Sequence, residues 1–236
     1  MYEGVHAHPD GESTVARLAK TAAEYGFDGV VVRNGADATD GDGPTGEDVR
    51  DTYDVDVVDG VEICATDPRT AGGSVGNVRS SRTIVAVRGD TAAVNRFAVE
   101  NDKVDVLARP MAGEGDFNHV LAKSAVANGV RIEFDLSSVL RESGGRRVRA
   151  LQSLRKLAEI VDYYDAPYVV SARPRSHLEL RAPRELRALG EQIGFSSEWV
   201  ERGLTEWGRL AERNRHVHSE SFIEPGVERG RHEKKR

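Results

Sequence analysis

Short apolar runs alternate with segments of helical period along the first 215 residues of the chain. Seven runs have the length and the β-branched content of buried strands: Gly4–Ala7, Gly29–Val32, Val57–Ile63, Thr83–Val87, Val104–Ala108, Val130–Phe134 and Tyr168–Ser171. Alternation of this kind predicts βα units and a parallel sheet with helices on both faces.

The intervening segments carry helical stripes with recognisable ends. Val15, Leu18 and Ala22 follow the i, i+3, i+7 spacing, with Ser13 as the predicted N-cap and Gly26 as the stop. Further helices are predicted from Asp116, as N-cap, to Gly129, from Arg147 to Tyr164, from Glu185 to Ile193 and from Ser197 to Arg213.

Seven βα units in about 215 residues favour a closed or nearly closed TIM-like (βα) barrel over an open doubly wound sheet, although both layouts cover the sheet faces. We therefore expect one α/β barrel domain over residues 1–215. Residues 35–55 are polar, acidic and glycine-rich, which predicts a long loop with a short helix. Residues 216–236 hold few apolar side chains and mixed charge, and we expect a disordered C-terminal tail.

Composition narrows the class of protein. No run of about 18 apolar residues offers a membrane span, and the first residues lack the order of a signal peptide. The single cysteine, Cys64, cannot form an internal disulfide or a cysteine-based zinc site. We expect a cytoplasmic protein that does not bind membranes.

Charge is unevenly distributed over a chain whose net charge is −6. Residues 1–67 hold 4 basic and 16 acidic side chains, whereas residues 68–236 hold 29 basic and 23 acidic ones. Of the 33 basic residues, 27 are arginine, whose planar guanidinium suits bidentate phosphate contacts. The asymmetry indicates a polyanionic partner, although an acidic, lysine-poor proteome of a salt-loving organism also favours arginine.

The ends of the predicted strands carry an unusual number of arginines. In α/β barrels, functional groups lie at the C-terminal ends of the strands. Arg33, Arg88, Arg109 and Arg173 each follow a different predicted strand, and Arg175 lies two residues beyond the last of them. A ring of guanidinium groups at one rim would bind a polyanion and repel a metal ion; the alternative is a set of salt bridges at the rim.

His6, His8 and Glu62 are weak candidates for a metal site. His6 and His8 are spaced i, i+2 on a strand and therefore point to the same side. A metal needs three or more ligands, yet the second strand ends in Arg33-Asn34 and the last in arginines. We expect no functional metal and no cofactor.

Three further segments have ambiguous patterns. Gly41–Gly46 satisfies G-x-G-x-x-G but starts well after a strand and is surrounded by acids, so it predicts a loop and no dinucleotide site. Gly72–Gly76 lies among arginines and predicts either a plain connection or a loop close to an RNA backbone. Arg146, Arg147 and Arg149 form a basic cluster where cations oppose the helix dipole, which favours a partner for them.

Several stretches together resemble the archaeal ribonuclease P protein component 3 family. They include Gly60–Ile63, Ile84–Gly89, Asn95–Glu100, Val104–Pro110, Asn118–Lys123 and Ile132–Leu136, in order, and the resemblance covers most of the chain. That family is similar to the polymerase and histidinol phosphatase (PHP) barrels, which would account for His6-Ala7-His8. PHP enzymes have further metal ligands at the second strand and a late one, where this chain has Arg33-Asn34 and Arg173.

The resemblance implies a subunit of ribonuclease P, the endoribonuclease that removes the 5′ leader of precursor tRNA. It implies that the catalytic centre belongs to the ribonuclease P RNA, that this chain contributes no catalytic residue, and that it pairs with a small ferredoxin-like protein subunit. Motif positions carry over RNA contacts to Arg88, Arg96, Arg109, His119 and Lys123, with Arg173 and Arg175 as looser matches. The acidic first third further suggests a halophilic archaeon as the source.

Two other functional classes stay open at this point. A metal-dependent PHP-type phosphoesterase would bind divalent metal and hydrolyse its substrate without RNA. A non-enzymatic protein scaffold would bind a protein partner and show no RNA affinity.

Overall fold

The computed structural model describes residues 1–38, 46–219, 222–224 and 227–228. One parallel sheet follows the order of the chain, and each neighbouring pair is hydrogen-bonded. This confirms the predicted parallel βα pattern, with strand bounds that agree to within two residues. The strands are β1 (Tyr2–Val5), β2 (Gly29–Val32), β3 (Asp56–Ile63), β4 (Ile84–Arg88), β5 (Val106–Ala108), β6 (Arg131–Asp135) and β7 (Tyr168–Ser171).

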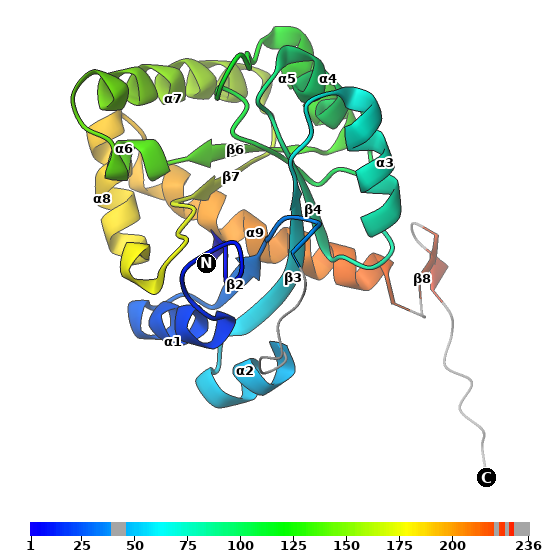
Figure 1. Cartoon of the computed structure of the whole chain (residues 1–236). Coiled ribbons are helices and arrows are strands. Elements are labelled where there is room, and N and C mark those ends of the chain that lie inside the picture. The colour runs from blue at the N-terminus through cyan, green and yellow to red at the C-terminus, as the bar shows by residue number, and fades with distance from the viewer. Residues whose placement is uncertain (39–45, 220–221, 225–226, 229–236) are drawn as a thin grey trace.

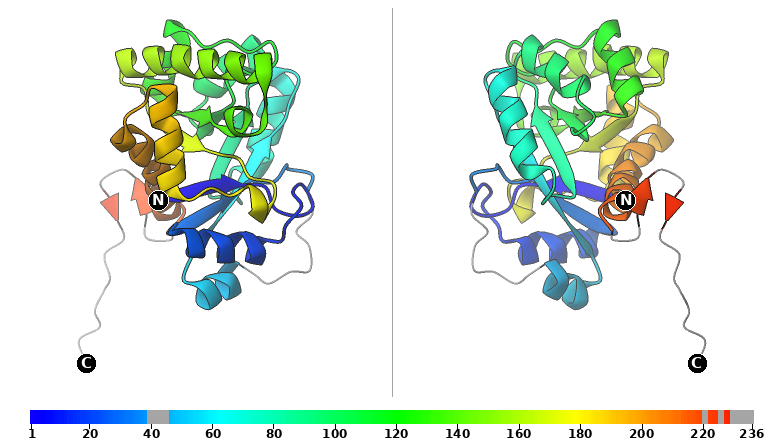
Figure 2. Two further views of the ribbon diagram at one scale, coloured as in Figure 1. Left: turned by 90° about the vertical axis from the view of Figure 1, so that its left-hand side faces the viewer. Right: turned by 90° about the vertical axis from the view of Figure 1, so that its right-hand side faces the viewer.

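Helices surround the strands on their outer side, as Figures 1 and 2 show. They are α1 (Val15–Tyr25), α2 (Gly46–Tyr53), α3 (Pro68–Val78), α4 (Ala92–Val99), α5 (His119–Asn128), α6 (Ser137–Arg141), α7 (Gly144–Tyr164), the 3₁₀ turn η1 (His177–Glu179) and α8 (Pro183–Ile193). The last helix, α9 (Ser197–Val217), packs against β7, β1 and the N-terminal end of the barrel. In the described residues, no helix is both long enough and apolar enough to span a bilayer.

The sheet curls into a nearly closed TIM-like barrel, and Glu3 fills the seam between its first and last strands. β1 and β7 do not form a hydrogen-bonded ladder. Instead, the buried carboxylate of Glu3 accepts from the Ser171 hydroxyl at 2.5 Å and from the Ala172 amide at 3.1 Å. The His6 amide also donates to the Pro174 carbonyl at 3.0 Å. The predicted barrel is therefore confirmed, with a side chain completing its closure.

Helix α9 closes the N-terminal end of the barrel interior. Its Trp207 packs among inward-facing strand residues such as Val31, Ile84 and Val169, and the indole N–H donates to the Val170 carbonyl at 2.9 Å. Asn214 on the same helix donates to the Thr83 carbonyl just before β4. Apolar side chains thus fill the N-terminal end of the barrel, which leaves polar groups to its C-terminal end.

The segment around Gly72–Gly76 is helical, so the prediction of a connecting loop there is wrong. It lies inside α3. Asp67 caps this helix by accepting from the amides of Arg69 and Thr70 at 2.9 and 3.0 Å, and Pro68 stands at its first position. A strong N-terminal cap with proline at N1 offsets the conformational cost of the glycines.

In two helices the N-cap is not the predicted residue but one close to it in the sequence. Thr14, not Ser13, caps α1, while the Ser13 hydroxyl contacts Nδ1 of His177 at 2.9 Å. Asn118, not Asp116, caps α5, and Asp116 pairs with Lys156 at 2.8 Å. In each case the polar residue that sequence spacing favoured makes a tertiary contact instead.

The loop and the tail reach beyond the described residues. The expected loop with a short helix over 35–55 contains α2, but most of the Gly41–Gly46 motif lies outside the described residues. At the C-terminus α9 continues to Val217, past the expected domain boundary, and the short strands β8 (Phe222–Glu224) and β9 (Val227–Glu228) pair in antiparallel fashion. The rest of the expected tail lies outside the described residues.

Candidate functional site

Arg33 lies inside the barrel and not at its rim. It follows β2, and its side chain is 0% exposed. One guanidinium nitrogen donates to Glu133, another lies 3.7 Å from Glu62, and the guanidinium stands 5.3 Å from the ring centre of Trp207. The prediction that Arg33 contacts a polyanion is therefore wrong, because RNA cannot reach this group in the folded barrel.

Arg173, which follows β7, belongs to the same buried cluster. Its Nη2 donates to Glu62 at 2.9 Å, and its Nη1 donates to Glu133 at 3.5 Å. The side chain is 10% exposed. The predicted rim position is thus wrong for Arg173 as well, because a strand-end side chain that points inward is covered by the opposite strands.

We define the interior arginine–glutamate network as four residues: Arg33, Arg173, Glu62 and Glu133. Burial alone would raise the pKa of Glu62, but the nearby positive charges of Arg33 and Arg173 more than offset this and lower it to about 2. Burial alone would lower the pKa of Arg173, yet the carboxylates of Glu133 and Glu62 raise it above its ordinary value. The Glu62 carboxylate and the guanidinium groups therefore stabilise one another's charged forms at the polar end of the barrel interior, whereas burial raises the pKa of Glu133 despite the same two arginines.

The interior does not fit the divalent metal that PHP barrels bind. His6 is buried, and its Nε2 lies 3.2 Å from Nη2 of Arg173 and 3.6 Å from Glu62. Burial, reinforced by the charge of Arg33, lowers the pKa of His6 to about 3, and His8 is exposed outside the barrel. Among the described residues, no three His, Cys, Asp or Glu side chains are grouped to hold a metal ion. A metal beside His6 would stand against two guanidinium groups, which take up the available carboxylate.

Arg88, Arg109 and Arg175, here called the mouth arginines, do lie at the C-terminal end of the barrel. Arg88 is 35% exposed and its Nε lies 2.8 Å from Asp90; Arg109 is 31% exposed and its Nε lies 3.2 Å from Asp135. Arg175 is exposed, and its amide donates to Glu179 at 2.8 Å. Each can reach solvent, with an acidic side chain or a carbonyl holding it in place.

Asp135 links the mouth to the interior network. Its Oδ2 faces Nε of Arg109 at 3.2 Å and Nε of Arg173 at 3.8 Å. Both arginines have a left-handed backbone, with φ of 52° and 48°, and both precede a proline. That conformation is costly for a residue with a side chain and is uncommon before proline, so the surrounding contacts must hold both turns.

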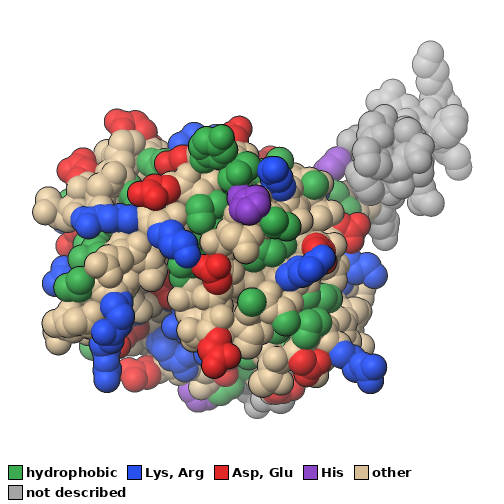
Figure 3. All heavy atoms as spheres, turned by 90° about the horizontal axis from the view of Figure 1, so that it is seen from above, with side chains coloured by type: hydrophobic (Ala, Val, Ile, Leu, Met, Phe, Trp, Pro, Cys, Tyr) green, Lys and Arg blue, Asp and Glu red, His purple; other side chains and the backbone are tan. Residues whose placement is uncertain are grey.

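Arg96, His119 and Lys123 lie on the outer helices α4 and α5. Arg96 is on α4, 70% exposed, and pairs with Glu100 at 2.8 Å. His119 and Lys123 are exposed on α5, and the Lys123 ammonium lies 5.6 Å from the ring centre of Tyr164. Figure 3 shows the face of the molecule above α4, α5 and α7, where cationic, acidic and hydrophobic side chains are interspersed. The predicted contacts therefore divide into an interior pair, a mouth set and a helix set.

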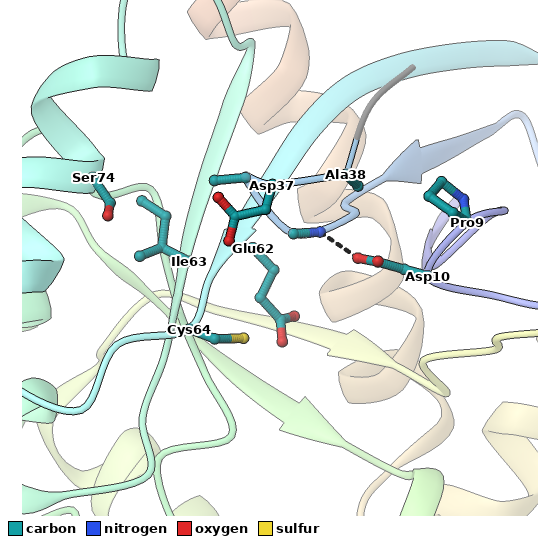
Figure 4. A pocket seen from close by; sticks show the side chains of 10 residues that line it. Pro9, Asp10, Asp37, Ala38, Glu62, Ile63, Cys64 and Ser74 are labelled. Carbon is teal, nitrogen blue, oxygen red and sulfur yellow. Dashed lines mark hydrogen bonds between the residues drawn. The ribbon is translucent and has the colours of Figure 1, made fainter. Parts of the chain in front are cut away.

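A cavity of about 370 Å³ opens beside the mouth, and its lining is acidic. Figure 4 shows Asp10, Asp37 and Glu62 around it, with the Asp10 carboxylate accepting from the Gly35 amide at 2.5 Å. Carboxylates repel phosphate, so this cavity does not serve as a polyanion site.

Sequence reasoning missed Glu133 and Asp135, which hold the arginines. The strand β6 reads Arg-Ile-Glu-Phe-Asp, and a charged side chain at every second position indicates that one face of this strand meets charge. That alternation was the available signal for an inward carboxylate at Glu133.

A family model described as RNase P subunit p30 matches residues 1–219 of this chain. The chain belongs to the ribonuclease P subunit p30 family. Ribonuclease P protein component 3 of the halophilic archaeon Halorubrum lacusprofundi is 59% identical to this p30-family chain over 239 residues, which cover 99% of each chain.

Solved structures agree with the p30-family fold. A chain in the cryo-EM structure of archaeal ribonuclease P with mature tRNA superposes with a TM-score of 0.82 at 21% identity, covering 100% of both chains. Histidinol phosphate phosphatase from Lactococcus lactis, complexed with zinc, L-histidinol and phosphate, superposes with a TM-score of 0.52 at 10% identity, covering 82% of this chain and 94% of that one. At these identities both likenesses concern the barrel fold alone.

Proposed function

We propose that this chain is a protein subunit of ribonuclease P that binds the catalytic RNA and supports removal of the 5′ leader from precursor tRNA. The observation that carries the proposal is the interior arginine–glutamate network. Where a PHP-type enzyme needs open metal ligands, Arg33 and Arg173 bind Glu62 and Glu133. The chain therefore acts through its surface, and the cleavage chemistry belongs to the RNA.

The proposed RNA contacts are the mouth arginines together with Arg96, His119 and Lys123. Charged hydrogen bonds from arginine to phosphate are among the stronger polar contacts that proteins make. Arg88 and Arg109 are the best placed of these residues, because Asp90 and Asp135 orient their Nε atoms while about a third of each side chain stays accessible. Arg173 contributes indirectly by facing Asp135, and Arg33 by holding Glu133 in the interior network.

The proposed partners are the ribonuclease P RNA, precursor tRNA through the assembled enzyme, and a small ferredoxin-like protein subunit. Family membership supports the first two, and the ferredoxin-like partner follows from the family resemblance. A subunit of this kind would act in the cytoplasm, where precursor tRNA is processed in an archaeal cell.

Reconstitution tests the proposal. The full chain is added to a cognate ribonuclease P RNA and its partner subunits, and 5′ cleavage of a precursor tRNA is measured at fixed salt. We expect this chain to raise the cleavage rate. No stimulation at saturating protein would overturn the proposal, and hydrolysis by the chain alone with Mn²⁺ or Zn²⁺ would favour the phosphoesterase instead.

A further inference from the structure

The first two-thirds of α7 carry cations and no acid. Between Gly144 and Ala158 the sequence contains Arg146, Arg147, Arg149, Arg155 and Lys156, all exposed, and neither Asp nor Glu. We call these five side chains the α7 basic segment. The chain has 39 acidic residues and a net charge of −6, and a longer acid-free stretch, residues 68–89, holds four arginines in 22 residues, so the α7 stretch is the denser in cations.

The position of these charges is unfavourable for the helix itself. The N-terminal end of a helix carries a partial positive charge, which destabilises cations in the first turns. The first turn of α7 contains no acidic residue to compensate. Helix stability therefore does not explain Arg146, Arg147 and Arg149.

Partners within the chain do not explain them either. Among the described residues, Arg147 and Arg149 make no ion pair, and Arg146 lies 3.5 Å from Glu142 in an exposed contact. By contrast, Arg88, Arg109 and Arg96 each face a carboxylate at 2.8–3.2 Å. The charge at the start of α7 is thus the least compensated part of the surface near the candidate contacts.

We propose that the α7 basic segment binds the phosphate backbone of an RNA strand, an inference that rests on the proposed function. Arg146, Arg149 and Lys156 follow the spacing i, i+3, i+10 and fall on one side of the helix, and Lys156 also pairs with Asp116 at 2.8 Å. At 1.5 Å per residue they extend over roughly 15 Å. A linear array of this length suits a linear polyanion better than a single small anion. Because α7 packs against α5, the segment belongs to the helix next to the one that carries His119 and Lys123.

The test compares two variants with equal loss of charge. The first is R146Q/R147Q/R149Q. The control is R17Q/R184Q/R213Q, which removes three exposed arginines from α1, α8 and α9 that make no ion pair among the described residues. Each variant is assembled with ribonuclease P RNA and the partner subunits, and the apparent affinity is measured over a series of KCl concentrations.

The α7 variant should assemble roughly tenfold more weakly or worse at the lowest salt. Its slope of log affinity against log salt should be smaller by about two, since each phosphate contact contributes roughly 0.7–0.9. The control should stay within about twofold of the natural chain. R146K/R147K/R149K should retain most of the salt slope, because lysine keeps the charge. The melting temperature of R146Q/R147Q/R149Q should be unchanged or higher, since an unfavourable charge leaves the helix start.

Three results would overturn the inference. One is equal weakening by the α7 and control variants, which would mean a diffuse charge effect. Another is a loss of binding to the small protein subunit in the absence of RNA, which would assign the segment to a protein partner. The third is competition by inorganic phosphate at constant ionic strength, which would indicate a small-anion site. Failure of the natural chain to stimulate cleavage is a separate outcome and would overturn the proposed function.

Discussion

Arg173 donates from Nη2 to Oε1 of Glu62 at 2.9 Å across the barrel interior, although 111 residues separate the two in the chain. Arg173 follows β7, whereas Glu62 lies in β3, so the contact ties distant strands of the sheet together. The pair is buried, and both residues have a second charged partner of the opposite sign. This arrangement makes the interior network a structural feature with measurable consequences for stability.

Breaking one side of the network should destabilise the protein strongly. Replacing Arg173 with Met leaves Glu62 and Glu133 buried without part of their compensation, and we expect a loss of about 3–5 kcal/mol. The double variant R173M/E62M should lose less than the sum of the two single variants. Urea unfolding at fixed salt measures both. R88M, which removes an exposed pair with Asp90, should cost about 1 kcal/mol or less, and an equal cost for R173M and R88M would contradict the buried assignment.

The seam residue Glu3 should make stability depend on pH. Burial raises the pKa of Glu3 to about 7, even though hydrogen bonds from Ser171 and Ala172 act in the opposite direction. Because the folded pKa lies above the unfolded value of 4.5, the folded state holds this proton more tightly. Its contribution is complete below about pH 4.5 and is lost as the pH rises through about 7.

The comparison is between the natural chain and E3Q, with the free energy of unfolding measured from pH 4.5 to 7.5. The natural chain should lose on the order of 2–3 kcal/mol more than E3Q over this range. Glu62 has the opposite sign, since its lowered pKa means that its contribution is lost only as the pH falls from about 4.5 towards 2. Parallel pH profiles for the two proteins would show that Glu3 does not titrate in this window.

Sequence patterns were sufficient for the strand order and most helices, because apolar periodicity reports which residues face a core. They failed at the strand ends. Arg33 and Arg88 both follow apolar runs and have the same residue type, yet one is fully buried and the other is 35% exposed. The difference depends on which carboxylates the opposite strands supply, and Glu133 lies 100 residues from Arg33. Local sequence carries no information on such a pairing.

The backbone conformation at two strand ends could not be predicted from the sequence either. Arg109 and Arg173 adopt positive φ before proline, where local preference favours extended backbone. Tertiary contacts surround both turns, because Asp135 faces both side chains and Arg173 also donates to Glu62 and Glu133. The prediction failed differently at Gly72–Gly76. It took the glycines as evidence against a helix and gave no weight to the N-cap at Asp67, so it missed α3.

The two N-terminal histidines should be dispensable for RNA-dependent cleavage. H6A/H8A removes both candidate metal ligands of β1 and its extension. Because Arg173 already contacts His6 and Glu62, we expect a loss of stability at most, of about 1–3 kcal/mol for a buried polar group. Cleavage by the assembled enzyme and elemental analysis of the purified chain provide the measurements. Stoichiometric zinc or manganese in the natural chain, absent from H6A/H8A, would reinstate a metal site.

Interior and mouth arginines should differ in what their loss affects. R33A removes a buried partner of Glu133 and should cost several kcal/mol of stability. R88A and R109A remove partly exposed groups and should leave the circular dichroism spectrum and the melting temperature nearly unchanged. Their effect should fall on assembly with the RNA, by roughly tenfold for each, as expected for a charged hydrogen bond of about 1.5–3 kcal/mol. Lysine at position 88 or 109 should rescue only in part, because an ammonium cannot contact two phosphate oxygens through a planar fork.

The control is R209A on α9, a 65% exposed arginine whose partner Glu206 lies 3.8 Å away. It should affect neither folding nor assembly. Equal weakening of assembly by R209A, R88A and R109A would mean that RNA binding is spread over the basic surface and not focused at the mouth. Unfolding of R88A or R109A would show that the ion pairs with Asp90 and Asp135 are needed for folding. The mouth arginines would then be structural residues and not RNA contacts. A stable R33A chain with weakened assembly would place the RNA within reach of the interior, which its complete burial argues against.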